Sequence, residues 1–94
     1  MTNENELFLQ VEEAVRAVLN TEEGEIKMES MFRADLNTES IDFLDITFEI
    51  EKRTGVELDF PSVLKYMTEK KGTDAITDLS IEDVVHYLSY LKNK

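Results

Sequence analysis

Ser40 is one of the serines that stand where the sequence predicts the start of a helix, a position at which a hydroxyl is available for chemistry. It stands in the run Glu39-Ser40-Ile41-Asp42, where an amphipathic segment begins. A serine at the start of a helix exposes its hydroxyl beside backbone N–H groups that lack helical partners, and these groups favour a nearby phosphate. The acids Glu39 and Asp42 oppose that negative charge. Taken alone, the pattern favours an ordinary helix N-cap.

Other residue types that support catalysis or metal binding are scarce. The chain has no cysteine, which excludes disulfides, thiolate metal sites and cysteine nucleophiles. The single histidine, His86, cannot form a histidine-rich zinc site, and on a helical wheel it lies opposite the apolar stripe of its segment. Asp and Glu are abundant, but neither a Gly-rich phosphate loop nor a nucleophile with its base accompanies them. These observations favour a protein that is not an enzyme and holds no metal.

The charge of the chain is uneven along its length. The net charge is −11 over 94 residues, and residues 1–51 carry 14 acidic and 3 basic side chains, whereas residues 52–94 carry 7 of each. The first half would repel nucleic acid and attract basic protein partners. A solubility role accounts for acidic residues in general but not for this asymmetry.

The composition predicts a single domain over residues 1–94 that is soluble and cytoplasmic. A hydrophobic fraction of 41% suffices for a small core. The longest apolar run, Leu7-Phe8-Leu9, is far too short to span a membrane, and Met1-Thr2-Asn3-Glu4 does not resemble a signal peptide.

Three segments carry clear helix signals. Apolar residues recur at helical spacing between about Asn3 and Asn20, with Asn3 and Glu6 as a capping pair. Ser80 is a good N-cap for a final helix over residues 81–91. A helix with Pro61 at its first position should end at Gly72, with a loop over residues 73–79. Residues 21–39 lack a sustained period and predict a long loop that scattered apolar side chains pin to the core.

Residues 40–58 can be interpreted in two ways. The alternating stretches 46–51 and 56–60 would allow a β-hairpin. A helix over residues 40–54 makes sense of more residues, because three faces then separate. The polar face holds Asp42, Asp45, Glu49 and Lys52. One apolar face holds Phe43, Ile46, Thr47 and Ile50, and another, nearly opposite, holds Ile41, Leu44 and Phe48. Two apolar faces suit a helix that packs one into its core and offers the other to partners, although burial of both remains an alternative.

Residues 26–42 resemble the acyl carrier protein family. In that family a loop with a Phe and an Asp-Leu-Gly leads into Asp-Ser-Leu-Asp at the start of the second helix. Here Phe32, Asp35-Leu36-Asn37 and Glu39-Ser40-Ile41-Asp42 occupy those places, with the matching spacing. The resemblance implies an all-α four-helix bundle with a long loop between its first two helices.

The resemblance also implies a function. Ser40 would carry 4′-phosphopantetheine, which a holo-carrier-protein synthase adds from coenzyme A, and the arm would hold acyl groups as thioesters. Acyl-transferring and acyl-modifying enzymes with basic docking surfaces would be the partners of a monomeric carrier. The expected partner-binding residues, on and beside the outward face of the second helix, are Glu39, Ile41, Asp42, Leu44, Asp45, Phe48 and Glu49.

The sequence departs from the family pattern in several places. Glu39 and Ile41 are mild replacements, Lys52 stands where an acid is frequent, and Thr54-Gly55 replaces a bulky residue. The connection from Leu58 to Ile81 is longer than usual, which suggests a specialised carrier with dedicated partners. The resemblance implies that the carrier delivers acyl intermediates to enzymes of fatty acid, lipid or polyketide synthesis. We expect the helix in this connection to pack against the second helix, and a mobile surface insertion without effect on function is the alternative. A peptidyl or aminoacyl carrier, and an acidic interaction module without a prosthetic group, are the alternatives.

Overall fold

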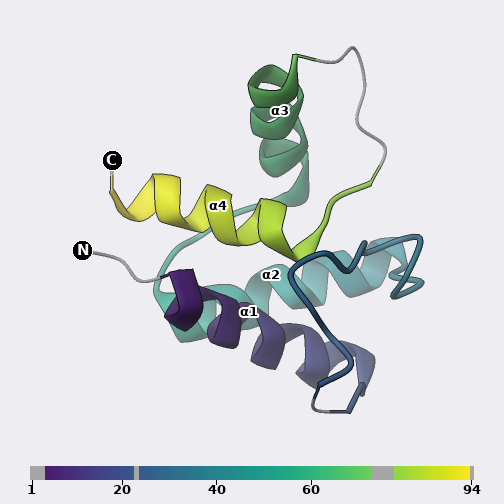
Figure 1. The fold of residues 1–94 in the computed structure, drawn as a ribbon. Coiled ribbons are helices and arrows are strands. Elements are labelled where there is room, and N and C mark those ends of the chain that lie inside the picture. Colours follow the sequence, from purple (N-terminus) through teal and green to yellow (C-terminus); the bar gives the residue numbers. More distant parts are fainter. Residues whose placement is uncertain (1–3, 23, 73–77, 94) are drawn as a thin grey trace.

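The computed structural model describes residues 4–22, 24–72 and 78–93, and their regular elements are four helices. These are α1 (Glu4–Leu19), α2 (Ser40–Thr54), α3 (Phe60–Lys71) and α4 (Ile81–Lys92). Helices α1 and α2 run side by side in opposite directions, α4 crosses above them, and α3 stands steeply against α4 (Figure 1). The predicted all-α four-helix fold is confirmed, and the hairpin alternative for residues 40–58 is wrong.

The ends of α2 are fixed by local hydrogen bonds. Glu39 is the N-cap residue, and its N–H donates to the carboxylate of Asp42 at 3.1 Å. At the other end Gly55 adopts φ 74°, a left-handed conformation that favours glycine, and its N–H donates to the Glu51 carbonyl at 2.8 Å. The helix therefore begins at Ser40 itself, one residue after its cap.

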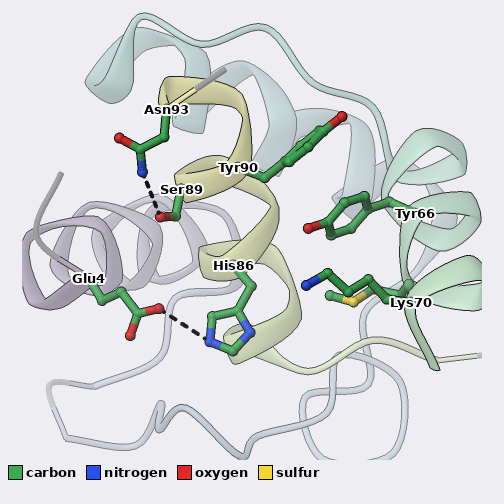
Figure 2. A pocket seen from close by; sticks show the side chains of 8 residues that line it. Glu4, Tyr66, Lys70, His86, Ser89, Tyr90 and Asn93 are labelled. Atoms are coloured by element: carbon green, nitrogen blue, oxygen red, sulfur yellow. Dashed lines mark hydrogen bonds and ion pairs between the residues drawn. The ribbon is translucent and has the colours of Figure 1, made fainter. Parts of the chain in front are cut away.

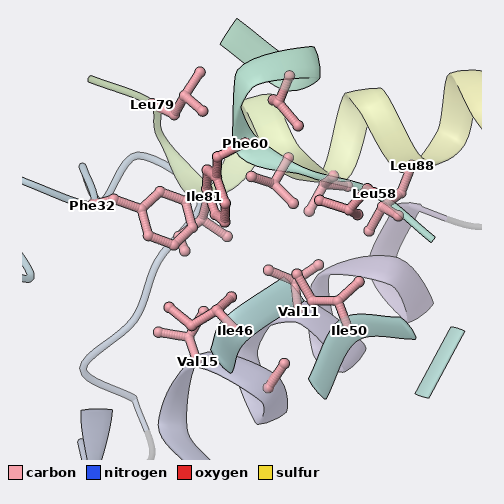
Figure 3. Close-up of a cluster of buried hydrophobic side chains, with 14 of the residues drawn as sticks. Val11, Val15, Phe32, Ile46, Ile50, Leu58, Phe60, Leu79, Ile81 and Leu88 are labelled. Carbon is pink, nitrogen blue, oxygen red and sulfur yellow. The ribbon is translucent and has the colours of Figure 1, made fainter. Parts of the chain in front are cut away.

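The core lies between α1, α2 and α4. Val15 lies beside Ile46 and Val11 beside Ile50, where α1 faces α2 (Figure 3). Ile81 and Leu88 of α4 close the same core and are completely buried. One apolar face of α2 is thus used for folding, as the wheel predicts.

The segment between α1 and α2 is tied to the residues that lead into α4. The Phe32 N–H donates to the Leu79 carbonyl at 2.8 Å, and the Ile81 N–H donates to the Ser30 carbonyl at 2.9 Å. Met31 and Ser80 form an isolated antiparallel bridge between these bonds. Backbone pairing, and not apolar side chains alone, therefore fixes this loop near the start of α2.

The start of helix α3 differs from the sequence expectation by one residue. Its N-cap is Asp59, whose carboxylate accepts from the Ser62 N–H at 2.8 Å, so that Pro61 occupies the second helical position and not the first. The helix ends at Gly72 as predicted, with φ 67°.

The partner of α3 is chiefly α4, which corrects the expected packing against α2. Val63 and Met67 are buried, and the ammonium of Lys71 pairs with the carboxylate of Asp83 on α4 at 3.3 Å. In the first turn of α3, Phe60 contacts Phe43 of α2, with the ring centroids 4.3 Å apart. The predicted cap at Asn3 and most of the loop over residues 73–79 lie outside the described residues.

Candidate functional site

Ser40 lies exposed at the first position of α2. The cap at Glu39 leaves the Ser40 side chain free of the capping role, which removes the ordinary explanation for a serine at this end of the helix. The first N–H groups of any helix lack helical acceptors and carry partial positive charge. A phosphate on the Ser40 hydroxyl would therefore lie close to favourable backbone dipoles.

A largely apolar hollow opens beside Ser40. Its volume is about 290 Å³, and its lining includes Arg33, Phe43, Phe60, Leu64 and Leu79 besides Ser40 itself. A second hollow of about 230 Å³ shares Ser40, Phe43 and Phe60 and extends toward Leu44 and Thr47. The serine hydroxyl therefore lies at the edge of apolar surface that is accessible from solvent.

Three phenylalanine rings from three different segments pack together at this hollow. Phe43 of α2 and Phe60 of α3 meet with ring centroids 4.3 Å apart, and Phe32 of the loop lies 5.6 Å from Phe43 and 5.4 Å from Phe60. Aromatic pairs at these separations contribute about 0.5–1.5 kcal/mol beyond their burial. The cluster therefore positions the loop, α2 and α3 around Ser40.

The rim of the hollow contains two charged residues that sequence reasoning did not select. The carboxylate of Asp78 accepts from the backbone N–H groups of Arg33 at 2.9 Å and Ala34 at 3.0 Å. The guanidinium of Arg33 lies 5.6 Å from the ring centroid of Phe43. Asp78 is far from Arg33 in sequence and carries no motif. Arg33 is one of three bases in residues 1–51, a signal that could have drawn attention to it.

The outward apolar face of α2 is exposed, as one interpretation of the sequence predicts. Ile41 is 67% exposed, Leu44 56% and Phe48 60%, and they are three of the five large apolar side chains that are exposed in the described part of the chain. Burial of both faces, the alternative, is wrong. Glu39 and Asp45 are exposed beside this face, and Asp42, whose carboxylate accepts from the Glu39 N–H, is half-buried.

Glu49 forms two ion pairs within the protein that the sequence analysis did not predict. Its carboxylate pairs with the guanidinium of Arg53 and with the ammonium of Lys52, the latter at 3.3 Å. Hydrogen bonds from Arg53, and then from Lys52, lower the pKa of Glu49 from its ordinary value. Arg53 also approaches Glu13 of α1 at 3.6 Å, so this end of α2 is less negative than its acids alone imply.

A hollow larger than the two beside Ser40 lies elsewhere, between α3 and α4. It measures about 490 Å³ and includes Tyr66, Lys70, His86 and Tyr90, with the imidazole of His86 held by Glu4 at 3.3 Å (Figure 2). None of the residues predicted for the site from the sequence lines it. The predicted residues gather instead around the start and the outward face of α2.

Two further findings concern what the described residues contain. Across residues 4–22, 24–72 and 78–93 no group of three His, Asp or Glu side chains could hold a metal ion. Over the same ranges no helix has the length and apolar character needed to cross a membrane.

Comparison with known proteins points to one family. The family model described as the phosphopantetheine attachment site matches residues 10–68, a range that includes Ser40 and all of α2. An acyl carrier protein of Petrotoga mobilis is 28% identical over 80 residues, which cover 84% of this chain and 94% of that protein. Another from Campylobacter lari is 29% identical over 86 residues, covering 92% and 96%. One from Treponema pallidum is 35% identical over 54 residues, covering 57% and 69%.

Proposed function

Because the chain belongs to the acyl carrier protein family, whose members carry covalent 4′-phosphopantetheine, we propose that the hydroxyl oxygen of Ser40 is the point of attachment. When bound, the arm supplies a terminal thiol that holds acyl groups as thioesters. The chain has no cysteine, so that thiol is the only one available to it. Members of the family are carriers and not enzymes.

The observation that carries this proposal is the setting of Ser40. The hydroxyl is exposed, stands at a helix N-terminus and borders an apolar hollow of about 290 Å³. Exposure admits a transferase, the helix terminus stabilises a phosphodiester, and the hollow offers apolar surface to part of an attached chain.

The docking surface that we propose lies on α2. Ile41, Leu44 and Phe48 provide exposed apolar area, while Glu39, Asp42 and Asp45 provide negative charge around it. Partners with basic surfaces, including a holo-carrier-protein synthase, would be drawn to this helix by long-range attraction and held by apolar contact. Glu49 contributes less, because Arg53 and Lys52 already neutralise it.

The biological role that follows is delivery of acyl intermediates to biosynthetic enzymes. We infer a monomeric, cytoplasmic carrier, with residues 1–94 as one domain, that serves fatty acid, lipid or polyketide synthesis. The helix α3 of 12 residues, in the long connection before α4, supports a specialised member with dedicated partners.

Modification of purified protein with coenzyme A and a promiscuous phosphopantetheinyl transferase tests the proposal. We expect intact-mass spectrometry to show one phosphopantetheine on the wild-type protein and none on the Ser40→Ala variant. Ser62→Ala, which removes a serine from the first turn of α3, should be modified like the wild type. Absence of an adduct from the wild-type protein would favour the interaction module without a prosthetic group.

A further inference from the structure

We propose that the guanidinium of Arg33 binds the phosphodiester of the prosthetic arm and so positions the arm beside Ser40. The inference rests on the proposed attachment at Ser40 and adds a role for a loop residue outside the attachment motif. Arg33 and Ser40 line the same hollow, with Arg33 contributed by the loop and Ser40 by α2. The arm would leave Ser40 across the surface that both residues border.

The direction of the Arg33 side chain is set by α2 itself. Its guanidinium lies 5.6 Å from the ring centroid of Phe43, which is one turn beyond Ser40 on the same helix. A cation over an aromatic face is attracted to the ring, and a guanidinium that rests there keeps its N–H groups available at the edge. The contact therefore places a positive charge close to the helix terminus that carries Ser40.

The backbone around Arg33 is held on both sides. Both oxygens of Asp78 accept from backbone, at 2.9 Å from the Arg33 N–H and 3.0 Å from the Ala34 N–H. The preceding residue, Phe32, is buried, and its N–H donates to the Leu79 carbonyl at 2.8 Å. A charge on an anchored backbone loses less freedom on binding an anion than a charge on a loose loop.

A phosphodiester on Ser40 would add negative charge to a region that is already acidic, so a nearby positive charge would stabilise it. A phosphodiester there would lie near the carboxylates of Glu39 and Asp42. Of the three bases in residues 1–51, Arg33 is the one that lines the hollow within the described chain. Arginine can also donate two parallel hydrogen bonds to two phosphate oxygens, which makes it better suited than a lysine to hold this group.

Side-chain NMR of arginine can test the contact directly. In protein labelled with ¹⁵N, we expect the Nε–H signal of Arg33 to shift between the apo and holo forms. Arg53 is the internal control, because Glu49 already holds its guanidinium at the far end of α2, and its signal should stay in place. The ³¹P signal of the holo protein should move toward that of a free phosphopantetheine diester in Arg33→Gln, and less so in Arg33→Lys.

A matched variant separates this contact from a general loss of charge. Lys27→Gln removes one exposed positive charge from the same loop and should leave the ³¹P signal as in the wild type. Salt of about 1 M, where the Debye length is about 3 Å, should reproduce part of the Arg33→Gln effect in the wild-type protein. Backbone amide spectra of the apo variants, expected to match the wild type, establish that the fold is intact.

The outcomes distinguish this inference from the function on which it rests. An arm on Ser40 with an unchanged Arg33 signal would overturn the role of Arg33 and leave the attachment standing. Equal ³¹P effects of Arg33→Gln and Lys27→Gln would also overturn it, because they would indicate a diffuse charge effect. Failure of any arm to attach at Ser40 would remove the proposed function itself.

Discussion

At the scale of single residues, the site combines an exposed serine with charged side chains that already form hydrogen bonds or ion pairs within the protein. The Asp42 carboxylate accepts from the N–H of the cap residue Glu39, that of Asp78 accepts from the Arg33 N–H of the loop, and that of Glu49 pairs with Arg53 and Lys52. Sequence reasoning selected Ser40 and Asp42, because a local motif marks them. It missed Asp78, because the hydrogen bonds that the Asp78 carboxylate accepts from Arg33 and Ala34 join positions 44 or more residues apart.

The lowered pKa of Glu49 predicts a pH effect on stability. A carboxylate whose pKa is lower in the folded protein stabilises the fold at pH values above the ordinary Glu pKa, about 4.3. That stabilisation is lost as the pH falls through the lowered pKa. We expect Glu49→Gln to unfold at lower urea concentration than the wild type at pH 7, and the difference to shrink below about pH 4. A difference that grows on acidification would contradict the assigned direction.

At the scale of elements, α2 packs one apolar face into the core and exposes the other apolar face to solvent. The helical interpretation predicted both faces from the spacing of apolar residues, since a helix wheel separates positions that a strand would mix. The packing of α3 was not predictable in the same way. Its own pattern indicates an apolar face but does not say whether α2 or α4 covers it, and an ion pair such as Lys71–Asp83 has no local sequence signal.

Two isoleucines of α2 provide a matched test of the two faces. Ile46→Ala should destabilise the protein by about 2–5 kcal/mol, because Ile46 is fully buried and its removal leaves a cavity. Ile41→Ala should change stability by less than about 0.5 kcal/mol but weaken transferase binding, since Ile41 lies on the exposed face. Urea denaturation and transferase kinetics give both numbers. Similar losses of stability in the two variants would refute the division of faces.

Charge reversal on α2 tests electrostatic docking. We expect Asp45→Lys to slow association with a basic transferase several-fold at low salt and to flatten its salt dependence, because rim charges act mainly on the association rate. Glu57→Lys makes the same net change at an exposed position after α2 and should have a smaller effect. Equal rates for Asp45→Lys and the wild type at low salt would count against this docking surface.

At the scale of the whole molecule, the acidic half of the chain forms α1, the long loop and most of α2. Residues 52–94, which include α3 and α4, carry equal numbers of acidic and basic side chains. The sequence alone established this asymmetry. It could not show that backbone pairing between residues 30–32 and 79–81 joins the two halves at the site. This pairing brings Asp78 to the rim of the hollow beside Ser40.

Repulsion among the acidic side chains of residues 1–51 should lower the stability of the folded protein at low ionic strength. Because self-repulsion opposes compaction and salt screens it, we expect the melting temperature to rise between about 0.01 M and 0.15 M NaCl, as the Debye length falls from about 30 Å to 8 Å. Thermal denaturation followed by circular dichroism measures the change. A melting temperature that falls with added NaCl would mean that attractive ion pairs outweigh the repulsion.

Peptide mapping of the modified protein tests attachment at Ser40 most directly. Cleavage after Lys and Arg releases residues 34–52 as one peptide, in which Ser40 is the only serine. Treatment with coenzyme A and a transferase should place the phosphopantetheine on this peptide, and fragmentation should assign it to Ser40. An arm on the peptide of residues 28–33, which contains Ser30, or on no peptide at all, would contradict the proposed function.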